Sequence, residues 1–396
     1  MFDRLKKLPD DPILGLLRLY REDDSPDKVD LGAGVYQNEQ GQTEVLGAVK
    51  QAEQRLWDSQ QTKVYEGLRG NADFNTAMTR MMFGADHPAL NDGRIVTVQT
   101  TGGSGGLHIA AGVLLRASPG VKVWASEPTW PNHQPLLSSA GINIETYPYY
   151  DASSNAIEFD AMLEGLQRAE RGDVVLLHGC CHNPTGADLS REQWDRVIDL
   201  LEERGLVPFI DVAYQGFAEG IDEDAYGIRA SAARLPELVV VSSCSKNFGL
   251  YRDRVGCTSI VAQSNEHAQT SVSHLANVTR RVYSMPPAHG AEVVQIILND
   301  AELTRLWLSE LGTMRDRVNN LRRQFAEMLA TKTGTDRFAF IAQQRGMFSL
   351  LGLDKAQIQR LRDEFHIYIV GSSRANIAGV SEANLDYLTD SIAAVL

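Results

Sequence analysis

The chain has 396 residues, of which 43% are hydrophobic and 22% are charged, and this composition excludes a disordered or fibrous protein. Lys and Arg number 38 against 51 Asp and Glu, a net charge of −13 that argues against nucleic acid as a partner. The length exceeds what one ordinary hydrophobic core fills, so we expect an α/β protein of two domains.

No apolar stretch is long enough to cross a bilayer. The longest, residues 107–115, contains His108 and is followed by Arg116. Charged residues near the N-terminus occupy the place of a signal peptide's apolar core, so we expect a cytoplasmic protein without membrane contact. The four cysteines lack the spacing of a zinc site or a disulfide framework, and no metal is expected.

Short apolar runs alternate with helical patterns through the middle of the chain. The runs are residues 121–124, 174–178, 206–210 and 238–241. Such runs, separated by helix-length segments, predict a parallel sheet buried on both faces, with ligands at the carboxyl ends of its strands. Between the second and third runs, Ser190 and Gln193 form a capping signal at the start of an amphipathic helix.

A second helix is predicted towards the C-terminus. Apolar residues recur at spacings of three and four from Leu311 to Met328. We interpret this helix as the bridge from a large domain into a smaller one. Because no Pro/Ser-rich linker divides the chain, the smaller domain is expected to be woven from both ends. Residues 1–45 are predicted to form an N-terminal arm and part of the small domain. Residues 46–310 are predicted to form the large domain, and residues 311–396 the rest of the small domain.

Reactive side chains follow two of the predicted strands. Lys246 lies in a Ser-rich segment after residues 238–241, where it is either a desolvated Schiff-base amine or a solvated lysine in a turn. Asp211 ends the run 206–210, and Tyr214 follows it. A carboxylate and a phenol placed in this way suit a pyridinium nitrogen and a ring oxygen, although Asp211 is equally well placed to cap a helix.

The Gly-rich segment 101–106 leads into a helical stretch and predicts an anion site. It lacks the spacing of a dinucleotide or nucleoside-triphosphate loop, so a phosphate monoester is the expected ligand. Arg254 is either a bidentate contact to that phosphate or an exposed arginine. Asn183 and Pro184 predict a sharp loop after the run 174–178.

Six segments together resemble one family, the class I aminotransferases that use pyridoxal 5′-phosphate, in the branch of aspartate and aromatic-amino-acid aminotransferases. They occur in the family's order over essentially the whole chain and are residues 31–36, 128–133, 180–186, 211–217, 245–251 and 283–290. The resemblance implies an α/β fold of type I for pyridoxal-phosphate enzymes. In that fold a mostly parallel seven-stranded sheet lies between helices in the large domain, and both chain ends form a small α/β domain.

The resemblance also implies how the cofactor would be held. Lys246, Asp211 and Tyr214 match the catalytic set: the Schiff-base lysine, the partner of the pyridine nitrogen and a donor to the ring oxygen. Asn183 is a second donor to that oxygen. The other implied cofactor contacts are the stacked Trp130, the Asp211 partner His133, and the phosphate ligands Gly103, Ser104, Ser243, Ser245 and Arg254. Tyr65 resembles a residue that reaches the neighbouring subunit's phosphate, which implies a homodimer with shared active sites.

Substrate recognition is implied at two arginines. Arg374 resembles the residue that binds the α-carboxylate, with Gly34, Trp130 and Asn183 beside it. Arg280 falls where the family places an arginine of the partner subunit for a second carboxylate, which implies dicarboxylate substrates; the adjacent Arg281 replaces the family's usual small residue.

Several positions depart from the pattern of strict aspartate aminotransferases. Apolar or smaller residues at Val64, Ser104 and Met285 favour an aromatic ring by about 1–3 kcal/mol. Gln37 and Thr43 follow the aromatic pattern only in part, and Cys244 and Ser373 replace the usual Tyr and Gly. We therefore expect a ping-pong enzyme that moves the amino group of tyrosine, phenylalanine and/or aspartate to 2-oxoglutarate. A strict aspartate aminotransferase and a non-catalytic sensor of amino acid or cofactor remain the alternatives.

Overall fold

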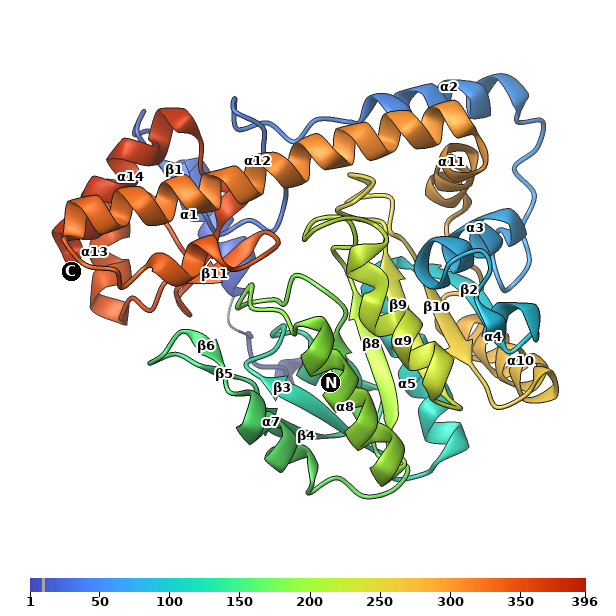
Figure 1. Ribbon diagram of the computed structural model, residues 1–396. Coiled ribbons are helices and arrows are strands. Elements are labelled where there is room, and N and C mark those ends of the chain that lie inside the picture. Colours follow the sequence, from blue (N-terminus) through green and yellow to red (C-terminus); the bar gives the residue numbers. More distant parts are fainter. Residues whose placement is uncertain (9–10) are drawn as a thin grey trace.

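The computed structural model describes residues 1–8 and 11–396, and a seven-stranded sheet forms its centre (Figure 1). The strand order is β2-β10-β9-β8-β7-β3-β4. The pairs β10–β2 and β10–β9 are antiparallel and the other pairs are parallel, which confirms the predicted fold. The strands are β2 (Ile95–Thr101), β3 (Lys122–Glu127), β4 (Asn143–Pro148), β7 (Val174–His178), β8 (Val207–Val212), β9 (Leu238–Ser243) and β10 (Val255–Val261).

Helices cover both faces of the sheet because its central strands are apolar on both sides. In β9, Val239 and Val241 pack in the core on one face, and Val240 packs in the core on the other. The first face is covered by α5 (Gly102–Ala117), α6 (His133–Ser139) and α10 (Asn265–Val282). The second is covered by α3 (Ala72–Phe83), α7 (Phe159–Leu166), α8 (Arg191–Arg204) and α9 (Tyr226–Arg234), and the short α4 (Pro88–Asn91) packs on α9. The capping box at Ser190 and Gln193 starts α8 as predicted.

The long helix α12 (Ala301–Thr333) connects the two ends of the molecule (Figure 1). It packs against α2 (Gly47–Ser59) and α11 (Ala288–Asn299) near its N-terminus and against α14 (Glu382–Val395) further along. The predicted helix from Leu311 to Met328 is confirmed, and it begins ten residues earlier because Asp300 caps it there. It therefore runs without a break through residue 310, where the sequence places a domain boundary.

The N-terminal segment lies with the C-terminal part of the chain. β1 (Val29–Asp30) pairs with β12 (Ile367–Tyr368), and β11 (Phe348–Leu350) pairs with β13 (Arg374–Asn376). The helices of this part are α1 (Pro12–Glu22), α13 (Lys355–Phe365) and α14, while β5 (Tyr150–Asp151) and β6 (Ala156–Ile157) form a separate hairpin. No helix among the described residues has the length and apolarity needed to cross a membrane.

Candidate active site

A cavity of about 240 Å³ lies at the carboxyl ends of the parallel strands. Its walls come from the first two turns of α5, the segment after β3, and the ends of β7, β8 and β9 with the segments that follow them. The cavity therefore gathers residues more than one hundred positions apart in the sequence. Ten of the predicted site residues line it, namely Gly103, Ser104, Trp130, Asn183, Asp211, Tyr214, Ser243, Ser245, Lys246 and Arg254.

Lys246 directs its ammonium group over the ring of Tyr214, with Nζ 4.8 Å from the ring centre. Burial lowers the pKa of Lys246 to about 8, against the opposing effect of Asp211, and the nearby charges of Arg254 and Arg374 add to the lowering. The amine is thus more nucleophilic near neutral pH than an exposed lysine.

The main chain after Lys246 is held by α12. Trp307 donates from Nε1 to the Asn247 carbonyl oxygen at 2.7 Å. The Trp307 ring also stacks on Phe248, with the ring centres 4.4 Å apart. These contacts fix the segment that carries the amine.

Asp211 is buried in a chain of polar contacts that begins with His133. His133 Nε2 lies 2.9 Å from Asp211 Oδ2, and its Nδ1 lies 2.8 Å from the Thr129 hydroxyl. The same hydroxyl lies 3.1 Å from Nε2 of His178, whose pKa burial lowers to about 3. Burial by itself raises the pKa of Asp211, but the hydrogen bond with His133 and nearby positive charge lower it overall. Asp211 is therefore an anion at neutral pH, as a protonated ring nitrogen requires.

Small residues and donors form a cradle at the start of α5. Gly102 has φ +66°, and a Cβ there would lie 2.7 Å from Nη2 of Arg254. A Cβ on Gly103 would lie 3.3 Å from Cβ of Ser243, whose hydroxyl donates to Ser245 Oγ at 3.0 Å. Two hydroxyls, a guanidinium and the positive end of α5 thus surround a space that side chains at these glycines would fill. This donor set fits a phosphate monoester.

Arg374, the residue that the sequence predicts to bind the α-carboxylate, lies beside the cavity. It is buried, donates to the Gly32 carbonyl oxygen at 3.0 Å, and contacts Oδ1 of Asn183 at 3.4 Å. Its guanidinium carbon lies 4.2 Å from the ring centre of Phe348, and Gly34 borders the same ring. Its Nε is buried without a partner among the described residues. This guanidinium therefore has a donor left for a carboxylate.

Two predicted site residues lie away from the cavity. Tyr65 is 92% exposed, and Arg280 is exposed in the last turn of α10. Of the positions that depart from the aspartate pattern, Ser104 lines the cavity and Val64 and Met285 do not. Gln37 and Thr43 also lie outside its wall. Cys244 and Ser373 are buried near it without lining it.

Some cavity residues were absent from the sequence predictions. Leu107, His178, Cys180 and Ala213 complete the lining. His178 had a signal, since it is the polar residue that ends the predicted run 174–178 at the ligand edge. Phe348, which faces Arg374, had no such signal, because in a sequence an isolated phenylalanine cannot be told from an ordinary core residue.

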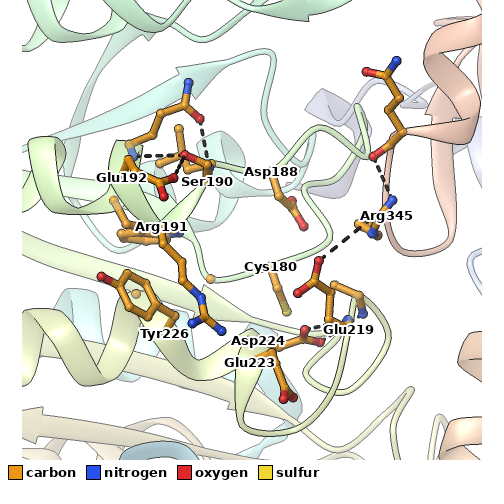
Figure 2. A pocket seen from close by; sticks show the side chains of 17 residues that line it. Cys180, Asp188, Ser190, Arg191, Glu192, Glu219, Glu223, Asp224, Tyr226 and Arg345 are labelled. Atoms are coloured by element: carbon orange, nitrogen blue, oxygen red, sulfur yellow. Dashed lines mark hydrogen bonds and ion pairs between the residues drawn. The ribbon is translucent and has the colours of Figure 1, made fainter.

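A larger cavity of about 440 Å³ lies between the start of α8, residues 218–227 and residues 343–345 (Figure 2). None of the predicted site residues lines it. Asp188, one of its carboxylates, accepts hydrogen bonds from the backbone of Cys181 and His182, and burial raises its pKa to about 6. Asp188 thereby shapes the loop that leads to Asn183, so its role is structural.

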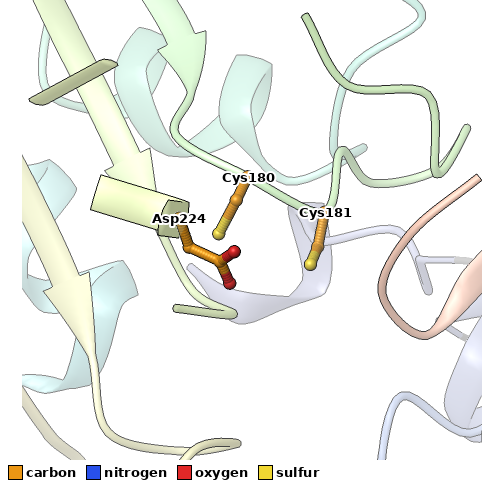
Figure 3. A group of neighbouring side chains, drawn as sticks. All are labelled: Cys180, Cys181 and Asp224. Atoms are coloured by element: carbon orange, nitrogen blue, oxygen red, sulfur yellow. The ribbon is translucent and has the colours of Figure 1, made fainter. Parts of the chain in front are cut away.

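Cys180, Cys181 and Asp224 form a tight group next to that cavity, with ligand atoms within 4.8 Å of one another (Figure 3). Asp224, however, accepts backbone N–H groups from four residues, 216, 218, 219 and 220. These bonds occupy its acceptor positions. Burial also raises the pKa of Cys181 to about 11, so the thiol resists losing the proton that a metal would displace. This geometry is that of a structural cluster.

Fold and site together define a transaminase. The model of the family "Aminotransferase class I and II" matches residues 26–392. The chain is 49% identical to an aromatic-amino-acid aminotransferase of Pseudomonas aeruginosa, over 100% of this chain and 98% of the relative. It is 46% identical to an aspartate aminotransferase of Haemophilus influenzae, over the full length of both. The chain therefore belongs to the class I and II aminotransferases.

A solved structure agrees with this assignment. The aromatic-amino-acid aminotransferase from Burkholderia pseudomallei, covalently bound to pyridoxal phosphate, superposes with a TM-score of 0.98 at 44% identity. The match covers 100% of this chain and 99% of that one.

Proposed function

We propose that this chain is a pyridoxal-phosphate-dependent aminotransferase that moves the amino group of tyrosine, phenylalanine or aspartate to 2-oxoglutarate. The observation that carries the proposal is the single cavity that joins Lys246, ionised Asp211 and a phosphate cradle beside Arg374. Relatives named for aromatic amino acids and for aspartate support both donor classes.

The residues of the cavity suit the parts of this cofactor. Lys246 would hold it covalently through Nζ, and Asp211 would pair with the ring nitrogen. Tyr214 and Asn183 would donate to the ring oxygen, while Trp130 would stack on the ring. The phosphate would lie among Gly103, Ser104, Ser243, Ser245 and Arg254. When bound, the cofactor supplies an electron sink for negative charge at the substrate α-carbon.

Proton transfer belongs to Lys246 in this proposal. With its pKa lowered to about 8, Nζ can accept a proton from the α-carbon and return it near neutral pH. Burial raises the pKa of Tyr214, so its hydroxyl keeps its proton and remains a donor. Asp211 contributes negative charge without taking up the proton.

We also propose a homodimer with shared sites. Tyr65 and Arg280 are exposed in the single chain, as residues that serve a neighbouring subunit would be. Large apolar side chains are exposed in the same part of the sequence as Tyr65, at Trp57 (82%) and Val64 (74%), and a second copy would bury such side chains. Arg280 of one subunit would then bind the distal carboxylate of a substrate in the other. We place the enzyme in the cytoplasm, as its sequence predicts.

Mixing variants tests the shared sites. Lys246→Ala dimers and Arg280→Ala dimers each lack an intact site for dicarboxylates. A dimer with one subunit of each kind regains one site with both residues intact. Activity with aspartate should therefore return when the two variants are unfolded and refolded together. If mixing restores none, Arg280 does not act across subunits.

A half-reaction titration tests the function itself. The cofactor's conversion from its aldehyde to its amine form is followed by absorbance, with aspartate and separately with phenylalanine. Conversion by both supports a dual enzyme, and conversion by aspartate alone supports the strict alternative. Lys246→Ala should abolish turnover, whereas Lys355→Ala, at an exposed lysine that starts α13, should not. A chain that binds the cofactor and converts neither amino acid would instead be a sensor.

A further inference from the structure

Arg322 of α12 is fully buried, with an exposed fraction of 0%. Burial lowers its pKa to about 9, which leaves the guanidinium charged at neutral pH. Among the described residues, its hydrogen-bond acceptors all belong to residues 341–349, and none of them is a carboxylate. The donors reach the carbonyl oxygens of Ile341, Arg345, Gly346 and Phe348 and the hydroxyl of Ser349, at 2.6 to 3.3 Å.

A buried charge is tolerated only when its donors are satisfied, so this arrangement ties the guanidinium to one loop conformation. Only a few backbone conformations allow five acceptors within nine residues to point at one planar guanidinium group. Arg322 therefore cross-links five residues of the segment 341–349, which we call the clamp loop.

The clamp loop leads directly to the carboxylate-binding arginine. It contains Phe348, whose ring lies under the Arg374 guanidinium at 4.2 Å and edge-on to Tyr214, with ring centres 6.1 Å apart. It also contributes to β11, which pairs with β13 so that Leu350 lies opposite Arg374. The Arg374 side chain thus rests on Phe348, and the strand that carries Arg374 pairs with the clamp loop at Phe348 and Ser349.

The clamp loop also contacts the turn that carries Asn183, which lines the cavity. The backbone N–H of Arg345 donates to the Gly186 carbonyl oxygen at 2.7 Å. A Cβ on Gly186 would collide with the Phe348 carbonyl oxygen, so the two backbones meet without a side chain between them. Asn183 lies on the same turn as Gly186, and its Oδ1 accepts a hydrogen bond from Arg374.

We propose that Arg322 is a positioning residue, which sets Arg374 and Phe348 in the geometry that binds the substrate's α-carboxylate. The inference rests on the proposed function. Arg322 acts through the clamp loop and touches neither substrate nor cofactor. The main chain after Lys246 is held by Trp307 instead, through Asn247 and Phe248, so loss of Arg322 should weaken carboxylate binding and leave the chemistry at Lys246 in place.

The experiment compares Arg322→Lys with Arg323→Lys in the holoenzyme. Lysine keeps the charge but cannot form the planar fork, and Arg323 is the exposed neighbour on the same helix. Half-reaction KM and kcat are measured for phenylalanine and 2-phenylethylamine, and for aspartate and β-alanine. The second member of each pair lacks the α-carboxylate. We expect R322K to raise KM for the amino acids by about 10-fold, which is about 1.4 kcal/mol, with kcat within about threefold.

The two compounds that lack the α-carboxylate supply the decisive comparison. Their KM values should stay within about twofold in R322K, and R323K should match the parent with all four compounds. An equal rise in KM for amino acids and amines would mean that Arg322 only supports the fold. An unchanged KM for all four compounds would mean that the clamp loop keeps its conformation without Arg322. Either result overturns the inference.

A milder variant tests the inference in case R322K does not fold. Ser349→Ala removes one acceptor of Arg322 and should raise KM for the amino acids by about threefold, with the amines unchanged. The same KM as the parent would overturn the inference. A parent enzyme that converts no amino acid would show that the proposed function is wrong. A parent that converts amino acids, with variants that match it, would show that only this inference is wrong.

Discussion

The acidity of Lys246 makes a quantitative prediction about cofactor attachment. A pKa of about 8 leaves about one Lys246 amine in ten neutral at pH 7, whereas the ordinary value of 10.5 leaves about one in three thousand. Only the neutral amine attacks an aldehyde. At pH 7, pyridoxal phosphate should therefore attach to Lys246 of the cofactor-free protein about 300-fold faster than to an exposed lysine. This comparison assumes that the two neutral amines are equally nucleophilic.

The assay is the rate of the absorbance change on mixing, measured from pH 6 to pH 10. The rate should rise about tenfold per pH unit below the midpoint and level off above about pH 8. Nα-acetyllysine, mixed with the same cofactor, supplies the control for titration of the cofactor itself. Asp211→Asn removes a charge that raises the lysine pKa, so its midpoint should move to lower pH.

Two results would refute this reasoning. A midpoint near 10.5 would show that the cavity does not desolvate Lys246. An upward shift in Asp211→Asn would show that the carboxylate is not the group that stabilises the ammonium form.

Three further substitutions test other contacts. Arg374→Lys loses the planar fork and should raise KM for amino acids by about 10- to 100-fold, while kinetics with an amine that lacks the carboxylate stay close to the parent. Trp307→Phe leaves the buried Asn247 carbonyl oxygen without its donor and should lower the free energy of unfolding by about 1–3 kcal/mol in urea titration; an unchanged midpoint would contradict this role. Gly186→Ala places a Cβ against the Phe348 carbonyl oxygen at φ +70° and should lower the melting temperature by several degrees, whereas a neutral effect would show that the clamp loop can move away.

The sheet was only partly predictable from the sequence. The four predicted runs are β3, β7, β8 and β9, whose residues are apolar on both faces. β2 and β10 were missed because they carry several hydroxyl residues. In the folded protein these hydroxyl groups form hydrogen bonds. The Thr97 hydroxyl oxygen lies 2.7 Å from those of both Thr79 and Ser259, and the Thr258 hydroxyl donates to the Gly106 carbonyl oxygen. Such partners come from distant segments, so no local pattern reveals them.

The site divides in a similar way. Residues at strand ends, such as Asp211 and Lys246, were predictable because parallel strands carry their carboxyl ends to one edge. Tyr65 and Arg280 lie outside the cavity, and their roles remain predictions that depend on a second subunit. Arg322 had no signal, because a buried arginine on a helix looks like a solvated one in the sequence.

The sequence by itself determined the α/β class, the family and the residue types that meet at the sheet edge, since these follow from local patterns and ordered motifs. Only the tertiary structure decided how acidic Lys246 is and which groups hold Arg374. Both depend on burial and on contacts between segments far apart in the chain. Electrostatic shifts and hydrogen-bond partners are properties of distance, and distance exists only once the chain has folded.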